Sequence, residues 1–363
     1  MSMMIRSFGY RLVQVAAATA ILASSASAQT SVSVSGGRLS LTTPSGDQSV
    51  KVEVSGSGLA RVFGFPGIAD GTSYGGLSGV TVTTGAGNDK VEFELLSSQS
   101  FDVRVDTGVG SAETKVKWKI LAGGFAPAAN IAVSGSEGQT RLVEVDLESE
   151  SNRAAVSIDT GSANQVAAKV ISSNASEFLR VAFAAAAPRT LLKVGSNASA
   201  LEVDVRGGAT PAADELVYKV MQSRRAEVNV NWAIDTGAGE DKVDVLVSAS
   251  GSEVTQRGSV LTRAGNDTVQ FETDAFSTVT GLAINGGPGA DLLAQMIKGR
   301  FQSSQSLRTS MLGGDGDDQL ILTTDTGIFG TGLPNDTFPL IECGLGFDRF
   351  NAFGLVRACE SRL

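Results

Sequence analysis

The stretch 311–322, MLGGDGDDQLIL, sets a glycine pair and three aspartates ahead of an alternating apolar run. The same order, a glycine-rich turn, a polar residue and an apolar residue two positions later, recurs along the chain, although the turns degrade between positions 89 and 214. Such a repeat must be explained before anything else in the fold. The polar positions follow one another at intervals of 23 to 30 residues: Asp89, Thr114, Arg141, Asn164, Thr190, Asp214, Asp241, Asp267, Asp291, Asp318 and Asp348.

The residue two positions after each of these is apolar in every repeat. In most repeats the alternation continues, as in Val91, Phe93 and Leu95, and this is typical of a strand with one buried face. A strand-turn-strand unit of about 26 residues cannot bury its apolar side alone, so successive units must stack. We therefore predict an all-β fold, a single-domain parallel β-helix (solenoid) of about 26-residue coils. The side chains expected in its continuous core include Val91, Val143, Val166, Val243, Val269 and Leu320. The eleven polar positions are expected to lie along one edge of the solenoid.

A β-sandwich also shows alternation, but it gives no reason for one turn chemistry to return at this interval. Residues 29–80 are less regular, and we predict an N-terminal cap and irregular first coils there, followed by the solenoid over 81–363. The segment 175–187, ASEFLRVAFAAAA, leaves a short helix open.

The first 28 residues have the pattern of a secretory signal peptide. Arg6 and Arg11 lie in a short n-region, an apolar run follows from Leu12 to about Leu22, and Ala26-Ser27-Ala28 forms a small-residue site before Gln29. No later stretch approaches the roughly 18 apolar residues of a membrane helix, so no membrane insertion is expected. These features predict a secreted protein, located outside the cell, on its surface or in the periplasm.

Composition narrows the chemistry further. The formal net charge of −9 disfavours nucleic acid as a partner and favours cations. Histidine is absent, which excludes a Ser-His-Asp triad and the usual zinc ligand. The two cysteines, Cys343 and Cys359, predict one disulfide that pins the C-terminal coil of an exported chain.

Two stretches, 286–293 and 313–320, fit the pattern G-G-x-G-x-D-x-U, where U is large and apolar. This motif resembles the calcium-binding nonapeptide of RTX, or haemolysin-type, exported bacterial proteins, in which turn carbonyls and the aspartate bind Ca²⁺ between coils. RTX repeats run in tandem, whereas here one motif occurs per coil, so the resemblance implies Ca²⁺ along one edge at most. The candidate ligating and turn residues are Gly286, Gly289, Asp291, Gly313, Asp315, Gly316, Asp317 and Asp318, with looser matches at Asp89, Asp241, Asp267 and Asp348.

Electrostatics gives a separate reason to consider a cation. If the coils stack in register, the aspartates from Asp214 to Asp348 form a column with neighbours about 4.8 Å apart. Two like charges at that distance repel by roughly 3 to 4 kcal/mol at an effective dielectric constant of about 20. The alternative is that these residues only form turns, since aspartate suits turn conformations and caps backbone N–H groups.

Two functions remain open from the sequence. One is an exported non-catalytic β-solenoid, adhesin-like or structural, whose partners are calcium and a surface polysaccharide or another protein. The alternative is a polysaccharide lyase or other carbohydrate-active enzyme on a β-helix scaffold, with Lys242, Arg263 or Arg349 beside the acidic column. An enzyme is expected to show a groove on its outer face in which acids and a base converge.

Overall fold

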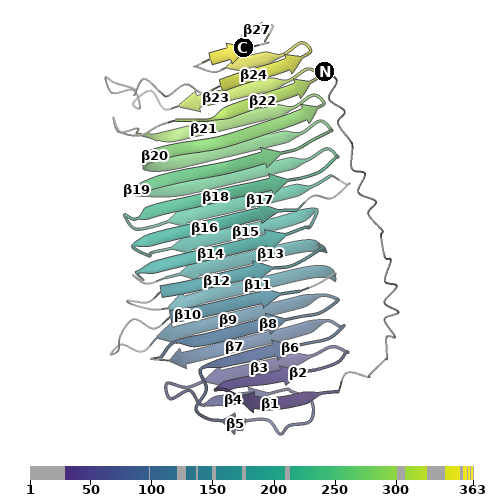
Figure 1. Ribbon diagram of the computed structural model, residues 1–363, viewed down its shortest axis with the longest axis vertical. Coiled ribbons are helices and arrows are strands. Elements are labelled where there is room, and N and C mark those ends of the chain that lie inside the picture. The colour runs from purple at the N-terminus through teal and green to yellow at the C-terminus, as the bar shows by residue number, and fades with distance from the viewer. Residues whose placement is uncertain are drawn as a thin grey trace, which may run out of the picture.

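The structure is a computed structural model that describes residues 29–97, 99–120, 128–135, 138–148, 153–173, 177–208, 213–300, 307–324, 340–351, 355–357, 359 and 361–362. The predicted signal peptide lies outside the described residues. Within them the chain is all-β and winds into a parallel β-solenoid with coils of about 26 residues, as predicted (Figure 1). No helix in this described part is long and apolar enough to cross a membrane.

Each coil contributes one strand to each of two parallel stacks. The strands β19 (Lys242–Leu261) and β20 (Thr268–Pro288) run through both stacks without a break. The first stack also contains β3 (Ser49–Val54), β7 (Asp89–Ser97), β9 (Ala112–Ile120), β11 (Gly138–Glu148), β13 (Ala163–Ser172), β15 (Arg189–Ser196), β17 (Glu215–Gln222), β21 (Leu292–Arg300), β23 (Gln319–Thr324), β25 (Arg349–Asn351) and β27 (Ser361–Arg362). The second stack contains β2 (Arg38–Thr42), β6 (Gly79–Thr83), β8 (Phe101–Asp106), β10 (Ala128–Ser134), β12 (Arg153–Asp159), β14 (Phe178–Ala185), β16 (Ala200–Gly207), β18 (Glu227–Asp235), β22 (Ser310–Asp315), β24 (Leu340–Leu345) and β26 (Leu355–Arg357).

The core lies between the two stacks, because alternate side chains of every strand point inward. Aromatic rings cross it, as where Tyr218 of the first stack packs between Phe183 and Trp232 of the second. Val243 and Val269 are partners in adjacent parallel strands, which contradicts a sandwich and confirms the solenoid. The six predicted core residues all belong to one cluster and are at most 4% exposed: Val91, Val143, Val166, Val243, Val269 and Leu320.

The strand register corrects one part of the sequence interpretation. Thr114 faces Val91 on one side and Val143 on the other, and Thr190 faces Leu216. The eleven polar positions therefore do not form one column. A shift of two residues keeps every side chain on the same face of a strand, so alternation alone cannot detect it.

Residues 29–80 differ from the coils that follow. Strand β1 (Ser31–Ser35) pairs antiparallel with β2, and β4 (Ala60–Phe63) pairs antiparallel with both β3 and β5 (Thr72–Tyr74). Parallel stacking begins where β6 joins β2 and β7 joins β3. These antiparallel strands lie at one end of the solenoid in Figure 1.

The short helix considered for 175–187 is wrong, because its described part contains strand β14. This strand pairs in parallel with β12 and β16, and Leu179, Val181 and Phe183 alternate into the core. Strand pairing on both sides and burial of these three side chains override the preference of the alanine run for a helix.

The C-terminal disulfide is present as predicted. Cys343, in β24, is fully buried and is bonded to Cys359, with the two Cα atoms 5.1 Å apart. The bond ties the last coil to the end of the chain.

Candidate functional sites

The aspartate column predicted from the sequence exists in the C-terminal coils as a hydrogen-bonded ladder. The backbone N–H of each aspartate except the last donates to Oδ1 of the aspartate one coil further on, so these five turn donors all have a partner. We call Asp214, Asp241, Asp267, Asp291, Asp318 and Asp348 the aspartate ladder; its five steps measure 2.8, 2.8, 2.9, 2.9 and 2.9 Å, and each residue is at most 2% exposed.

The glycines of the motif are required by the close stacking of these turns. A Cβ on Gly289 would lie 1.5 Å from the carbonyl oxygen of Gly265, and one on Gly316 would lie 1.7 Å from that of Gly289. Gly287 and Gly314 have φ of 95° and 120°, a region that favours glycine. The spacing of Gly289 and Gly316 in the motif is thus explained by backbone packing.

The first position of the motif separates two kinds of turn. In the coil of Asp241 this position is Thr236, whose hydroxyl donates to Oδ2 of Asp241 at 2.6 Å. In the coils of Asp291 and Asp318 it is Gly286 and Gly313, which have no hydroxyl. A Cβ on Gly286 would lie 2.2 Å from Oδ2 of Asp291 and 2.8 Å from the carbonyl oxygen of Gly313. Two acceptor oxygens from successive coils therefore face the same small space.

The pKa values of the aspartates at these two turns are raised above their ordinary value. Within the described residues, Oδ2 of Asp291 and Oδ2 of Asp318 are buried without a hydrogen-bond partner. Burial raises the pKa of Asp291 to about 7 and that of Asp318 to about 6, with neighbouring aspartates adding to the rise. The same cause raises the pKa of Asp267. A proton or another cation is favoured at these positions over bare charge.

The other predicted ligands lie on the outside of the edge. Asp315 and Asp317 are exposed, and Oδ1 of Asp317 accepts the backbone N–H of Phe347 at 2.9 Å. Among the residues that the structure describes, no group of three or more acidic, histidine or cysteine side chains is placed to hold a metal ion. Calcium binding remains a prediction, for which the available oxygens are the Oδ2 atoms, the turn carbonyls and the exposed carboxylates.

The basic residues beside the ladder have other partners. Arg263 forms an ion pair with Asp235 through two nitrogens, and Lys242 pairs with Asp244 at 3.1 Å. The charges of Arg263 and Lys242 are therefore balanced by half-buried acids outside the ladder.

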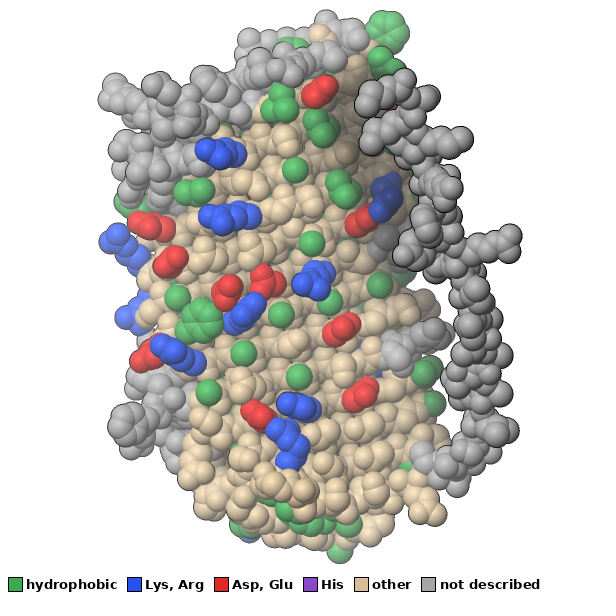
Figure 2. Space-filling model, viewed as in Figure 1, with side chains coloured by type: hydrophobic (Ala, Val, Ile, Leu, Met, Phe, Trp, Pro, Cys, Tyr) green, Lys and Arg blue, Asp and Glu red, His purple; other side chains and the backbone are tan. Residues whose placement is uncertain are grey.

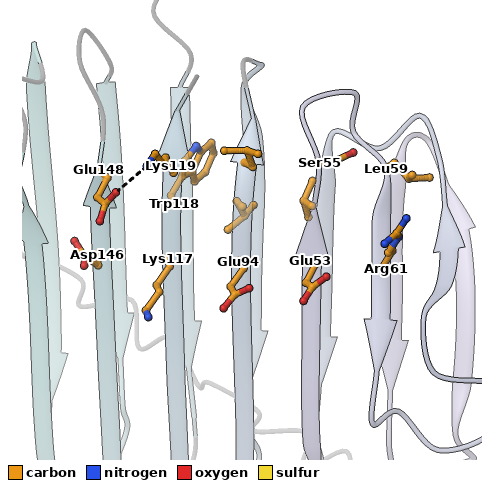
Figure 3. Close-up of a pocket in the computed structure, with 13 residues that line it drawn as sticks. Glu53, Ser55, Leu59, Arg61, Glu94, Lys117, Trp118, Lys119, Asp146 and Glu148 are labelled. Carbon is orange, nitrogen blue, oxygen red and sulfur yellow. Dashed lines mark ion pairs between the residues drawn. The ribbon is translucent and has the colours of Figure 1, made fainter. Parts of the chain in front are cut away.

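A second candidate site, which the sequence analysis missed, is a groove of about 590 Å³ on the outer face of the first stack (Figure 3). Register places Glu53, Glu94, Lys117 and Asp146 side by side on β3, β7, β9 and β11. Alternation already placed Lys117 and Asp146 on the outside of their strands. Only the register brings them together with the two glutamates.

Most charges in this groove are already paired. Lys51 lies 2.9 Å from Glu53 and 3.0 Å from Glu94, and Lys119 lies 3.7 Å from Glu148. Asp146 is half-buried; its burial, and then the charge of Glu148, raise its pKa. The groove can thus bind a polar chain, and its one carboxyl with a raised pKa stands beside Lys117.

The fold and its edge define a class, a parallel β-solenoid whose C-terminal coils are joined through glycine–aspartate turns. Comparison with protein-family models, with curated proteins and with solved structures finds no match to this chain.

Proposed function

We propose that the protein is an exported, non-catalytic β-solenoid with an adhesin-like or structural role, and that its glycine–aspartate edge binds Ca²⁺. The observation that carries the proposal is the aspartate ladder, in which the motif's carboxylates hold successive coils together and do not converge on a reaction centre. The face in Figure 2 supports it, because charged side chains there are sparse and several lie next to opposite charges. Export is tested by the mass of the mature chain, which is expected to begin at Gln29.

Calcium binding is supported by the two turns that start with glycine. Each offers a buried carboxylate oxygen and a carbonyl oxygen from the next coil, and Ca²⁺ accepts six to eight oxygen ligands in loose geometry. Asp315 and Asp317 lie exposed at the same edge and, with water, would supply further ligands. A cation there would also offset the charge of the ladder.

The test is calorimetric titration and thermal melting of the chelator-stripped mature chain with Ca²⁺. Calcium is expected to add about 2.7 kcal/mol of stability at a free concentration a hundredfold above its dissociation constant. Asp318→Asn should remove most of this gain, whereas Asp244→Asn, at a half-buried residue outside the ladder that is paired with Lys242, should keep it. If the chelated wild type and Asp318→Asn both melt as the calcium-loaded wild type does, the ladder residues are turn formers only.

A carbohydrate-active enzyme is the second candidate, favoured by the groove in Figure 3, where Glu94, Lys117 and Asp146 adjoin. A lyase would use a base near neutral pH and would leave unsaturated sugar ends that absorb ultraviolet light. Production of such ends by the wild type, and their loss in Asp146→Asn, would overturn the non-catalytic proposal. Absence of product across neutral and acidic polysaccharides, with and without Ca²⁺, supports it.

A further inference from the structure

One row of charges on the outer face of the first stack breaks the pattern of its neighbours. Along the first coils the signs alternate from strand to strand: Lys51 faces Glu92, Glu92 faces Lys115, Lys115 faces Glu144 and Glu144 faces Lys169. The next two steps then place lysine opposite lysine, because Lys169 faces Lys193 and Lys193 faces Lys219. All three are exposed, and we call Lys169, Lys193 and Lys219 the lysine column.

Among the described residues, the ion pair of this column lies at one end, where Lys169 is 2.7 Å from Glu144. Within the described residues neither Lys193 nor Lys219 has an ion pair. The outward neighbours on both sides of the column are uncharged: Ala167, Leu191 and Val217 in one row, and Ile171, Gly195 and Met221 in the other.

Like charges directly opposite in adjacent strands destabilise a sheet. The column therefore costs stability, in a protein whose formal net charge is −9. A row of ammonium groups on an aliphatic floor has the chemistry to bind anions while it packs against apolar C–H surface.

The column continues into a groove on the same face. This groove has a volume of about 590 Å³, begins at Val217 and Lys219, and carries Leu246, Met296 and Ile321 on its floor. Its two acids are already paired: Asp244 with Lys242 at 3.1 Å and Glu272 with Lys298 at 2.6 Å. The outer face from Lys169 to the groove is thus first basic and then apolar, and the acids of the groove are neutralised by ion pairs.

We infer that the lysine column and this groove bind a linear anionic polysaccharide that lies along the solenoid axis. One lysine is presented per coil step of about 4.8 Å, which is comparable to the length of one sugar unit, so a polymer with a carboxylate on each sugar meets successive lysines. The C–H faces of the sugar rings pack on Leu191, Val217 and Leu246. This inference rests on the proposed adhesin-like function and names the class of its partner.

The test uses the full mature chain and polygalacturonate as the probe, with dextran of matched length as the neutral polymer. We expect binding to polygalacturonate that weakens as salt is raised, and no binding to dextran. The double variant Lys193→Gln, Lys219→Gln should bind at least about tenfold more weakly. The controls Lys90→Gln and Lys119→Gln, at ion-paired lysines outside the column and its groove, should stay within about twofold of the wild type.

The inference is overturned if the wild type does not bind polygalacturonate at low salt, or if the double variant binds as tightly. Equal affinity for duplex DNA or for anionic lipid vesicles also overturns it, since that indicates unspecific charge attraction. Removing the repulsion should leave the melting temperature of the double variant unchanged or higher; if it fails to fold, Lys193→Gln alone serves as the test. Cleavage of the polymer with binding intact would instead refute only the non-catalytic function.

Discussion

Two regions of the solenoid provide hydrogen-bond partners for the backbone groups of their turns in opposite ways. In the C-terminal coils, carboxylates of the aspartate ladder accept N–H groups from the preceding coil. In the central coils, Arg141 is buried instead and donates to the preceding turn: to the carbonyl oxygen of Gly108 at 2.5 Å, to that of Thr107 at 3.4 Å, and to the Thr107 hydroxyl. Stacked turns leave both donors and acceptors facing the neighbouring coil, and the side chain at the turn decides which of them is satisfied.

The two solutions differ in how far they extend. An aspartate accepts with its carboxylate and donates with its own N–H, so the ladder continues from coil to coil. The Arg141 guanidinium donates to the turn of the preceding coil but cannot accept a hydrogen bond, so it does not continue a ladder. The regions also differ in charge, since burial raises the pKa of Asp291 and lowers that of Arg141, an effect that Asp106 and Asp89 oppose.

The sharpest way to break the ladder region is to add one methyl group to its stacked glycines. Gly289→Ala would place a Cβ 1.5 Å from the carbonyl oxygen of Gly265, so the backbone of one of the two turns would have to shift. We expect a loss of more than about 4 kcal/mol of unfolding free energy, measured by denaturant titration. Gly281→Ala, where the nearest atom would be 3.8 Å away, is the matched control and should change stability by less than about 1 kcal/mol. Equal effects of the two substitutions would refute close stacking.

The counterpart in the central region is Arg141→Met, which keeps most of the side-chain volume but removes its donors. The carbonyl oxygens of Thr107 and Gly108 would then be buried without these hydrogen bonds, at a cost of about 3 kcal/mol. Arg180→Met removes an exposed arginine paired with Asp204 and should cost less than about 1 kcal/mol. If both variants unfold at the same denaturant concentration, Arg141 does not stabilise its turn in this way.

The sequence was sufficient to predict the repeat, the buried face of each strand and the column of aspartates in the C-terminal coils. Alternation fixed which side chains are buried, and identical turn chemistry in successive coils aligned Asp241 with Asp267 and Asp291. It failed at Thr114, because a strand shifted by two residues buries the same face. In the central coils the turns share no motif that would set the register.

The candidate sites also divide into one that the sequence predicts and one that requires the strand register. The edge was found because its glycines and aspartates are adjacent in sequence. The groove with Glu94, Lys117 and Asp146 draws on separate coils, so it required the register. The hydrogen bonds of the ladder were also out of reach, because a motif does not say whether a carboxylate points at a cation or at a neighbouring N–H group.

Within the ladder, turns that start with threonine can be compared with those that start with glycine. Thr236→Ala removes the hydroxyl that donates to Oδ2 of Asp241 and leaves that oxygen in the state of its Asp291 counterpart. We expect a loss of about 1 to 3 kcal/mol in unfolding free energy at neutral pH. Thr255→Ala, on the outer face of β19, is the control and should lose less than about 0.5 kcal/mol. A loss in Thr236→Ala no larger than in this control would show that the hydroxyl is dispensable.

The smallest effect we expect is a change, at the two turns that start with glycine, in how the unfolding free energy depends on pH. The pKa of Asp291 rises from 3.8 to about 7 and that of Asp318 to about 6, so the folded state prefers their protonated forms. Their contribution to stability is fully present below pH 3.8 and is lost as pH rises through about 6 to 7. Surface pairs such as Asp235 with Arg263, which lowers the pKa of Asp235, act in the opposite direction and are lost as pH falls.

Local measurement separates the two contributions. In calcium-free buffer, hydrogen exchange of β21 and β23 in the wild type should accelerate, beyond its intrinsic pH dependence, between about pH 4 and about pH 7. Asp291→Asn mimics the protonated carboxyl. Its amide oxygen still accepts the N–H of Asp267, and its NH₂ group replaces Oδ2, near the carbonyl oxygen of Gly313. This variant should lose most of the acceleration, whereas Asp244→Asn should keep the wild-type profile. If Asp291→Asn follows the wild type over this range, the titrating groups lie elsewhere and the ladder carboxylates stay ionised as the turns stack.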